Sequence, residues 1–434
     1  MKKTAVLVLC LLVAALMPLM ATGSSEAGKD TGKPYAGTTL RMLDTPHPWL
    51  DGLKAFVGEF VEKTGIRVEF EDLATDPKSQ KLLVELMAGS STIDVTSLRP
   101  LNELKLFGLN NFAVDLKPYL VNDAQFDLKD YLDSAIQACT YEGKLLGVPL
   151  YNERAILYYR KDLFQQKGLQ PPKTMDELVE AAKKFHDPKN NFFGMVARGR
   201  VNQLITGGFA SYLFSFGGDF NTKDKALMDS PAAITAMKFF SSLLRNYGPP
   251  GIENYNWPEA AALMAQGRVA MFTDADAIYL NVADPKKSAF ADKIGYAVFP
   301  AGPAGSRPFN VIVGGMMMNP FSKQKEASIE FIKWANSKDV VLRMQKRGLP
   351  MSRTSVWDDP SSTASWPADL VKVMRESNKI GVGYDRPRVI NVAEARDILS
   401  RPILIGFEGG DVEAAAIAAN KQFQALIDEE NKKK

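Results

Sequence analysis

The stretch YEGKLLGVPLYNERAILYYRKDLFQQKGLQPPKTMDELVEAAKKF at residues 141–185 decides the fold. Two apolar runs, at residues 145–151 and 155–159, predict strands, and the polar elbow NER, which begins with Asn152 and Glu153, separates them. Two helices follow, and the second begins at a T-x-x-E capping box. Because the elbow lies between two buried strands, Asn152 and Glu153 are the first candidates for contact with a ligand.

Alternating strands and helices precede this stretch. Apolar runs at residues 38–43, 66–70 and 93–98 predict three strands, with helical apolar stripes between them. This order is typical of a parallel sheet with helices on its faces, in which ligands collect beyond the carboxyl ends of the strands. The loops after the first and third strands therefore supply Asp44, His47 and Arg99 as candidates. For His47, packing between its two flanking prolines is an equally good interpretation.

Further strands are predicted downstream, at residues 192–197, 269–272, 294–299 and 308–318. The first of these is followed by Arg198 and Arg200, and the second by Asp274 and Asp276. All four side chains have the chemistry of a polar binding site at a strand end. A structural salt bridge for one arginine is an equally good interpretation, and we expect one aspartate to face the site while the other caps the next turn.

Two further features of this region have a functional and a structural interpretation. Gly314 and Gly315 would let the backbone approach a ligand, but glycine also serves hinges and bulges. Trp257 begins a helix capped by Asn256 and Glu259, where its ring would either stack on a ligand or pack in the first turn.

The N-terminus has the features of a secretory signal peptide. Lys2 and Lys3 precede an apolar run that ends in small residues, so residues 1–23 are expected to be removed on export to the periplasm or cell envelope. A retained anchor is the alternative, but the run is shorter than a span and contains a proline. Residues 24–37 are predicted to be a flexible leader. Cys10 ends a lipobox-like string, although the bulky leucine before it disfavours lipid anchoring.

Composition excludes several classes of protein. The 434 residues suffice for two or more domains, each with its own core. The formal net charge of +3 falls to +1 without Lys2 and Lys3, and no long block of like charge requires nucleic acid as a partner. Cys139 would be the sole cysteine of the exported chain, and His47 and His186 lie far apart. A disulfide, most zinc sites and a His-based catalytic triad are therefore disfavoured, and no cofactor or metal is expected.

The segment GKLLGVPLYNERAILYYRKDLFQQKGLQPPKTMDEL at residues 143–178 resembles the signature segment of bacterial extracellular solute-binding proteins that serve ABC importers of sugars. The resemblance continues, in the same order, through SFGGDF (215–220), SPAAITAMKFFSSLLRNYGPPG (230–251), QGRVAMF (266–272), GYAVFPAGPAG (295–305), the helix at 327–336 and RGLPMSRTSVW (347–357). Any one motif alone is weak, but the ordered set covers nearly the whole exported chain.

The resemblance, which is to maltose-binding-protein-like members, implies an α/β fold of the type II periplasmic-binding-protein class. Two lobes, each a mostly parallel sheet flanked by helices, would be joined by crossing strands and would close on the ligand by hinge motion. Residues 38–151 with 314–362 would form the N-lobe, and residues 152–313 with 363–434 the C-lobe. The protein would be a monomeric, non-catalytic component that captures a sugar or polyol and delivers it to the permease of an ABC importer.

The resemblance also bears on individual residues. It aligns Glu153 with a carboxylate that binds sugar hydroxyls at the hinge, and it places cleft residues near Tyr384 and Arg386. Sugar hydroxyls both donate and accept hydrogen bonds, so Asp, Glu, Asn and Arg suit them, while aromatic rings stack on the C–H faces of the sugar.

Three other functions are weighed against this one. A glycoside hydrolase would need two carboxylates about 5 to 10 Å apart, which Glu153 and Asp276 would have to supply. A ferric-ion receptor would use the adjacent Tyr158 and Tyr159, but strand alternation sends them to opposite faces. A polyamine receptor needs several acidic groups and aromatic walls, and the arginines near the expected site argue against it.

Overall fold

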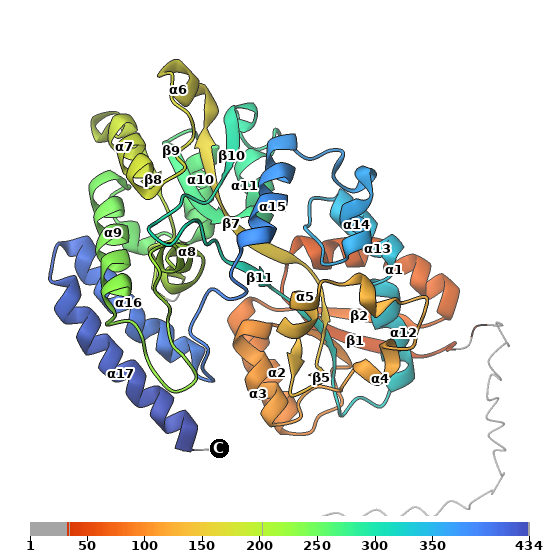
Figure 1. Ribbon diagram of the computed structural model, residues 1–434. Coiled ribbons are helices and arrows are strands. Elements are labelled where there is room, and N and C mark those ends of the chain that lie inside the picture. The colour runs from red at the N-terminus through yellow and green to blue at the C-terminus, as the bar shows by residue number, and fades with distance from the viewer. Residues whose placement is uncertain (1–32, 34, 202, 433–434) are drawn as a thin grey trace, which may run out of the picture.

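The computed structural model describes residue 33 and residues 35–201 and 203–432. The predicted signal peptide, with Cys10, and most of the predicted leader lie outside the described residues. The described chain forms two bodies, each built around its own sheet, with β7 and β11 where the two meet (Figure 1).

The first body is built on a five-stranded sheet of order β2-β1-β3-β12-β6. Its strands are β1 (Thr39–Asp44), β2 (Arg67–Asp72), β3 (Val95–Leu98), β6 (Val148–Pro149) and β12 (Gly315–Met318). A small hairpin and helices complete it: β4 (Thr140–Tyr141), β5 (Lys144–Leu145), α1 (Pro48–Thr64), α2 (Thr75–Met87), α3 (Pro100–Leu109), α4 (Lys117–Leu120), α5 (Asp133–Ala138), α12 (Lys325–Ala335), α13 (Lys338–Lys346) and α14 (Thr354–Asp358). Leu40 and Met42 of the sheet pack with Leu50 and Leu53 of α1 in its core.

The second body is built on a sheet of order β10-β7-β9-β8, with β11 paired to β7. Its strands are β7 (Asn152–Arg160), β8 (Phe193–Val196), β9 (Val269–Ala275), β10 (Ile294–Val298) and β11 (Asn310–Ile312). The longer helices around it are α6 (Lys161–Gln166), α7 (Met175–Phe185), α8 (Ala210–Ser215), α9 (Pro231–Tyr247), α10 (Trp257–Ala265), α11 (Tyr279–Ala283), α15 (Ala368–Ile380), α16 (Val392–Glu408) and α17 (Val412–Lys432). One apolar core joins β7, β8 and β9 to α9, α16 and α17.

Both sheets are mixed. In the first, β1 pairs in parallel with β2 and β3, whereas β12 is antiparallel to β3 and β6. In the second, β8 and β9 are parallel, whereas β7 is antiparallel to β9, β10 and β11. β7 follows the short β6 of the first body, and β12 follows β11 of the second. The strands that run against their neighbours are therefore those at which the chain passes between the bodies.

Three extended segments lie side by side at this junction. The amide of Leu150 donates to the carbonyl of Gly314 at 2.9 Å, and the amide of Val313 donates to the carbonyl of Tyr151 at 3.2 Å. On the other side, the amide of Asn152 donates to the carbonyl of Pro350 at 2.9 Å. The backbone that links the two bodies is thus a hydrogen-bonded ribbon.

Local sequence determines where several helices begin. The Thr174 hydroxyl accepts a hydrogen bond from the amide of Glu177, as the capping box predicts, although the Glu177 carboxylate accepts from Lys173 instead of Thr174. At α10 the reciprocal capping box of Asn256 and Glu259 is complete. These caps satisfy amide groups that have no partner within the helix.

Some sequence-based boundaries differ from the structure. The single strand predicted for residues 308–318 is divided between the two sheets as β11 and β12, because Val313 and Gly314 lie in the connecting ribbon. The helix expected to open at Ser322 begins at Lys325, because the Ser322 hydroxyl donates to Asp94 at 2.5 Å. Among the described helices, none is both long and apolar enough to cross a membrane.

Candidate ligand-binding site

Glu153 lies in the second residue of β7, beside the connecting ribbon. Among the described residues, its carboxylate has no hydrogen bond or ion pair. Burial raises its pKa to about 7, the positive charge of Arg198 opposes this shift, and the charges of Asp276, Asp274 and Asp385 add to it. Glu153 is partly exposed, so its carboxylate is accessible to a ligand that offers a hydrogen-bond donor.

Asp274 and Asp276 come from the carboxyl end of β9, and each is paired with an arginine. Arg198 donates to both Asp274 oxygens, at 2.8 Å from Nε and 2.5 Å from Nη2. Arg154, the third residue of β7, donates to Asp276 Oδ2 at 2.7 Å from Nη1. Both aspartates are fully buried. Asp274 also accepts from the amide of Ala275 at 2.6 Å, so each aspartate holds an arginine and Asp274 in addition bonds the backbone that follows it.

Asp44, at the carboxyl end of β1, presents one free oxygen. Its Oδ1 accepts from the Ser97 hydroxyl at 2.7 Å and from the Thr45 amide at 2.8 Å. Its Oδ2 is buried and has no hydrogen-bond partner among the described residues. Burial raises the pKa of Asp44, which the charge of Lys78 partly offsets. Oδ2 of Asp44 is therefore a hydrogen-bond acceptor on the first body that has no partner among the described residues.

His47 has a structural role at the start of α1. Its Nδ1 accepts from the Trp49 amide at 3.1 Å, and its ring stacks on Tyr151 with a centroid separation of 4.8 Å. Burial lowers the pKa of His47 to about 4, so the ring is neutral at physiological pH. Its Nε2 lies 3.3 Å from the Tyr151 hydroxyl. These contacts favour the packing interpretation of His47.

The remaining candidates at the ribbon are held by protein contacts. Asn152 accepts from the Ser352 hydroxyl at 2.9 Å. A methyl group added at Gly314 would lie 3.2 Å from Leu150 Cδ1, and one added at Gly315 would lie 3.0 Å from Cys139 Sγ. Both glycines therefore serve close packing in the first body.

Two candidates lie farther along the junction between the bodies. Arg99 is paired with Glu103, with Nε 3.2 Å from Oε1. Arg386 donates to both Asp385 oxygens, at 2.6 and 3.0 Å, and its Nη1 also donates to Asn102 of the first body.

The side chain of Tyr384 contacts Asp219 and Phe214 instead of the residues around Glu153. Its hydroxyl donates to Asp219 at 2.7 Å, and its ring meets Phe214 edge-on at 5.2 Å between centroids. The structure does not bring two other candidates to Glu153. Arg200 is exposed, and its side chain has no hydrogen bond or ion pair in the described chain, while Trp257 packs against the core of the second body.

Glu153, Asp274, Asp276, Arg154 and Arg198 form a polar cluster. Sequence reasoning missed two further charged residues whose charges act on members of this cluster. Asp385 pairs with Arg386, and its charge also acts on Glu153. Arg396 lies in α16, where its Nε and Nη2 are buried without a hydrogen-bond partner among the described residues. The sequence carries a signal for the burial of Arg396, because it lies three positions before the buried Leu399 on α16.

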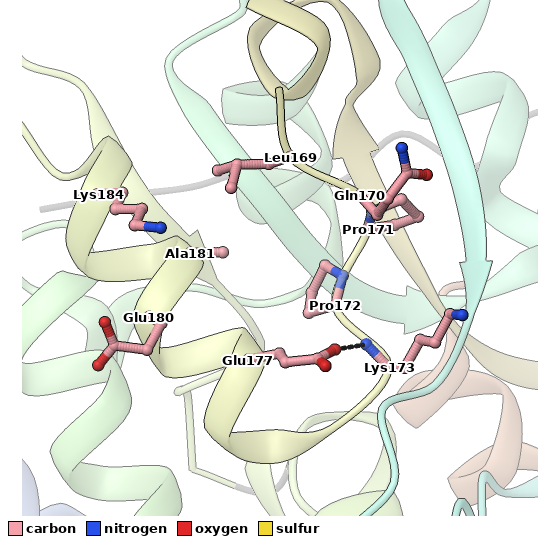
Figure 2. A pocket seen from close by; sticks show the side chains of 9 residues that line it. All are labelled: Leu169, Gln170, Pro171, Pro172, Lys173, Glu177, Glu180, Ala181 and Lys184. Atoms are coloured by element: carbon pink, nitrogen blue, oxygen red, sulfur yellow. Dashed lines mark hydrogen bonds between the residues drawn. The ribbon is translucent and has the colours of Figure 1, made fainter. Parts of the chain in front are cut away.

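One hollow of the surface lies away from the candidate site. Figure 2 shows a cavity of about 310 Å³ between the Leu169–Lys173 turn and α7, where the Glu177 carboxylate accepts from the Lys173 amide. None of the residues that line it belongs to the polar cluster around Glu153. Within the part of the chain that the structure describes, no three His, Cys, Asp or Glu side chains are grouped as a metal site would require.

Comparison with known proteins places this geometry in a family. The profile of the family described as bacterial extracellular solute-binding protein matches residues 47–341. A probable amino-acid ABC transporter periplasmic-binding protein of Sinorhizobium fredii is 27% identical over 347 residues, which are 78% of each chain. An erythritol/L-threitol-binding protein of Mycolicibacterium smegmatis is 27% identical over 363 residues, covering 77% of this chain and 75% of that protein.

The fold also matches a solved structure of known ligand. An ABC transporter solute-binding protein of Agrobacterium radiobacter in complex with ribitol is 28% identical and superposes with a TM-score of 0.81, covering 91% of this chain and all of that one. The two-body α/β architecture is therefore that of type II periplasmic binding proteins.

Proposed function

The chain belongs to the bacterial extracellular solute-binding protein family, and on this premise we propose that it captures a sugar or polyol for an ABC importer. The observation that carries the ligand class is a pair of carboxyl groups beside the junction: Glu153 on the second body, which is partly exposed, and Asp44 on the first, whose Oδ2 is buried without a partner among the described residues. Each is an acceptor beside the junction, and a polyhydroxylated ligand offers one donor to each of them.

The two bodies would act as the lobes of the binding protein. We assign residues 38–151 with 314–362 to the N-lobe and residues 152–313 with 363–434 to the C-lobe. The hydrogen-bonded ribbon at Leu150, Gly314 and Pro350 would then be the hinge, and the ligand would be enclosed where Glu153 and Asp44 approach each other on closure.

We propose that the protein binds its ligand without catalysing a reaction. A glycoside hydrolase would require Asp276 to serve as an acid, base or nucleophile. That carboxylate is fully buried and accepts hydrogen bonds from both the amide and the guanidinium of Arg154. We also propose that the exported protein is a monomer and that it meets the permease of its importer in the periplasm or cell envelope.

A thermal-shift screen tests the ligand class. Erythritol, ribitol, mannitol and maltose would be compared with an amino-acid mixture, spermidine and ferric citrate. A true ligand at concentration L stabilises the folded protein by RT ln(1 + L/Kd), about 2.7 kcal/mol at a hundredfold excess over the dissociation constant, and so raises the unfolding temperature as its concentration increases. Stabilisation by at least one carbohydrate, recovered chemically unchanged, is expected. Stabilisation only by the amino acids, the amine or the iron would overturn the proposal.

A further inference from the structure

The connection between β8 and α8 contains a turn of π-helix. The turn comprises Leu204–Gly208, and the amide of Phe209 donates to the carbonyl of Leu204 at 2.9 Å. All five residues of the turn are buried. Single turns of π-helix are frequent at functional sites. In this protein the turn packs against Arg198, which follows β8.

Two glycines of the turn allow this close packing. A methyl group added at Gly207 would lie 2.8 Å from Cζ of Arg198, 2.9 Å from its Nη2 and 3.0 Å from its Nε. Because these three distances are nearly equal, Gly207 lies over the flat face of the guanidinium group. A methyl group added at Gly208 would instead lie 2.5 Å from the carbonyl oxygen of Arg198. Gly207 therefore contacts the charged side chain, and Gly208 contacts the backbone of the same residue.

The register of the second sheet places Arg198 at the same edge as Glu153. β8 runs parallel to β9, and Arg198, beyond the end of β8, donates to Asp274 of β9. β9 in turn pairs with β7, where Ala275 lies opposite Ala155, two residues after Glu153. Three neighbouring strands therefore bring Arg198 and Glu153 to the edge of the sheet where β7 leaves the connecting ribbon.

The guanidinium group of Arg198 has unused hydrogen-bond donors. A guanidinium carries five N–H groups. Nε and Nη2 of Arg198 each donate to Asp274, and Nη1 lies 3.5 Å from Oε1 of Gln203, at the outer limit of a hydrogen bond. These contacts use three of the five N–H groups, so two have no acceptor among the described residues. The side chain is 11% exposed, so part of the group is accessible to a ligand.

We propose that Gly207 is a positioning residue of the binding site, which holds the guanidinium plane of Arg198 so that its unused N–H groups meet an oxygen of the ligand. This inference rests on the proposed function, since it takes Arg198 as a contact of the sugar or polyol. Asp274 fixes one edge of the guanidinium through two hydrogen bonds, and Gly207 covers one of its faces. Together they prevent the plane from rotating. Because Asp274 already neutralises the charge of Arg198, the group that suits the unused donors is a neutral hydroxyl oxygen.

A double-mutant cycle tests the proposal by titration calorimetry, with erythritol, ribitol, mannitol and maltose as probes. Gly207→Ala should weaken the binding of the probe that the parent binds best by about tenfold to a hundredfold, the range of a hydrogen bond to a charged group. The added methyl group would displace the guanidinium, which is the far end of a flexible side chain, and leave the backbone in place. In the Arg198→Lys background the methyl group meets no guanidinium plane. There, Gly207→Ala should change the affinity by less than about twofold.

Gly208→Ala is the matched control, because its methyl group would meet the carbonyl oxygen of Arg198, which is present in both backgrounds. It should lower the ligand-free unfolding temperature by the same amount in both. An equal loss of affinity from Gly207→Ala in the two backgrounds would show that the glycine serves packing alone and would overturn the inference. Unchanged affinity of Gly207→Ala relative to the parent, or its failure to fold in both backgrounds, would overturn it as well. These results leave the proposed function intact, whereas a parent that binds none of the four probes would contradict both.

Discussion

Two partly buried titratable side chains at the junction have pKa values displaced in opposite directions. Glu153 is raised to about 7 and His47 is lowered to about 4, in both cases because burial disfavours the charged form. Their effects on stability between about pH 4.5 and pH 6.5 therefore oppose each other. In the parent protein the two effects partly cancel in the pH dependence of stability. Substituting one residue at a time separates them.

The variant Glu153→Gln should lack a loss of stability that the parent shows as pH rises. The folded protein keeps the Glu153 proton up to about pH 7, whereas the unfolded chain releases it near its ordinary value of 4.5. Its contribution to the free energy of unfolding is thus present below about pH 4.5 and is lost, by up to about 3 kcal/mol, as pH rises to about 7. Urea unfolding across this range should show the variant gaining stability relative to the parent as pH rises. Glu180→Gln, exposed on α7, should track the parent.

The same variant should weaken ligand binding. The loss of a charged hydrogen-bond partner of the ligand is expected to cost about 1 to 3 kcal/mol in titration calorimetry. Equal affinities in Glu153→Gln and the parent would remove Glu153 from the site.

His47→Asn should have the opposite pH signature. The unfolded chain protonates His47 below 6.5, whereas the folded protein resists protonation down to about pH 4. Its stabilisation is therefore complete above about pH 6.5 and is lost as pH falls towards 4. Asparagine retains an acceptor for the Trp49 amide at the helix N-terminus but does not titrate. The variant should lose less stability than the parent between about pH 6.5 and pH 4, and a parallel profile would contradict the buried neutral state.

At the level of residues, the sequence identified Glu153 because a polar elbow between apolar runs is a local pattern. It did not show that Asp274 and Asp276 are bound by arginines, because Arg198 is 76 positions and Arg154 is 122 positions away along the chain. Long-range pairing of this kind leaves no local signal, so residues with the correct chemistry were assigned to the ligand.

At the level of elements, β8 and the turn after it depend on a close backbone approach. A methyl group added at Gly199 would lie 2.2 Å from the carbonyl oxygen of Ile252, and the Gly199 amide donates to Tyr255 at 2.9 Å. The backbone has to remain this close for Arg198, the preceding residue, to reach Asp274.

Gly199→Ala is therefore expected to destabilise the protein by about 1 to 3 kcal/mol in urea unfolding, as overpacking does. Gly383→Ala is the matched control, because a methyl group there meets nothing within 4 Å and the backbone is not left-handed. Equal midpoints for the two variants would contradict the close approach. Any loss of ligand affinity in Gly199→Ala would further place Arg198 beside the ligand.

Elements with local signals were predicted well from the sequence. The N-cap residues of α7 and α10 and the strands β1, β2 and β3 follow from short-range patterns. The strand pattern alone did not divide residues 308–318 between two sheets, and the expected boundary between residues 313 and 314 came only from the family resemblance. The division depends on partners in β3 and β7, and the intervening Gly314 is compatible with a continuous strand.

For the whole molecule, contacts between the bodies should contribute to ligand affinity through closure. Lys105 of α3 lies 3.2 Å from Glu430 of α17, and Asn102 accepts from Arg386 on the same side. Both contacts join the two bodies without touching Glu153. If ligand binding closes the lobes, each contact stabilises the closed form, and the apparent affinity depends on it.

Lys105→Gln should therefore weaken ligand binding by about twofold to fivefold, as a partly exposed ion pair is worth less than about 1 kcal/mol. Small-angle scattering should show a larger radius of gyration for the variant than for the parent at subsaturating ligand. Lys63→Gln, exposed at the end of α1, is the control and should leave both measurements unchanged. Identical affinity and radius in Lys105→Gln and the parent would argue against closure on this side.

The position of β12 between β3 and β6 has a consequence for biosynthesis. A ribosome delivers β3 and β6 long before residues 315–318, so the sheet of the first body has two open edges while the second body is being made. Open edges pair readily with other chains, and strands that wait for distant partners fold slowly. We therefore expect the sheet of the first body to be completed only after β12 has emerged, and a chain that ends just before Gly315 to be prone to aggregation.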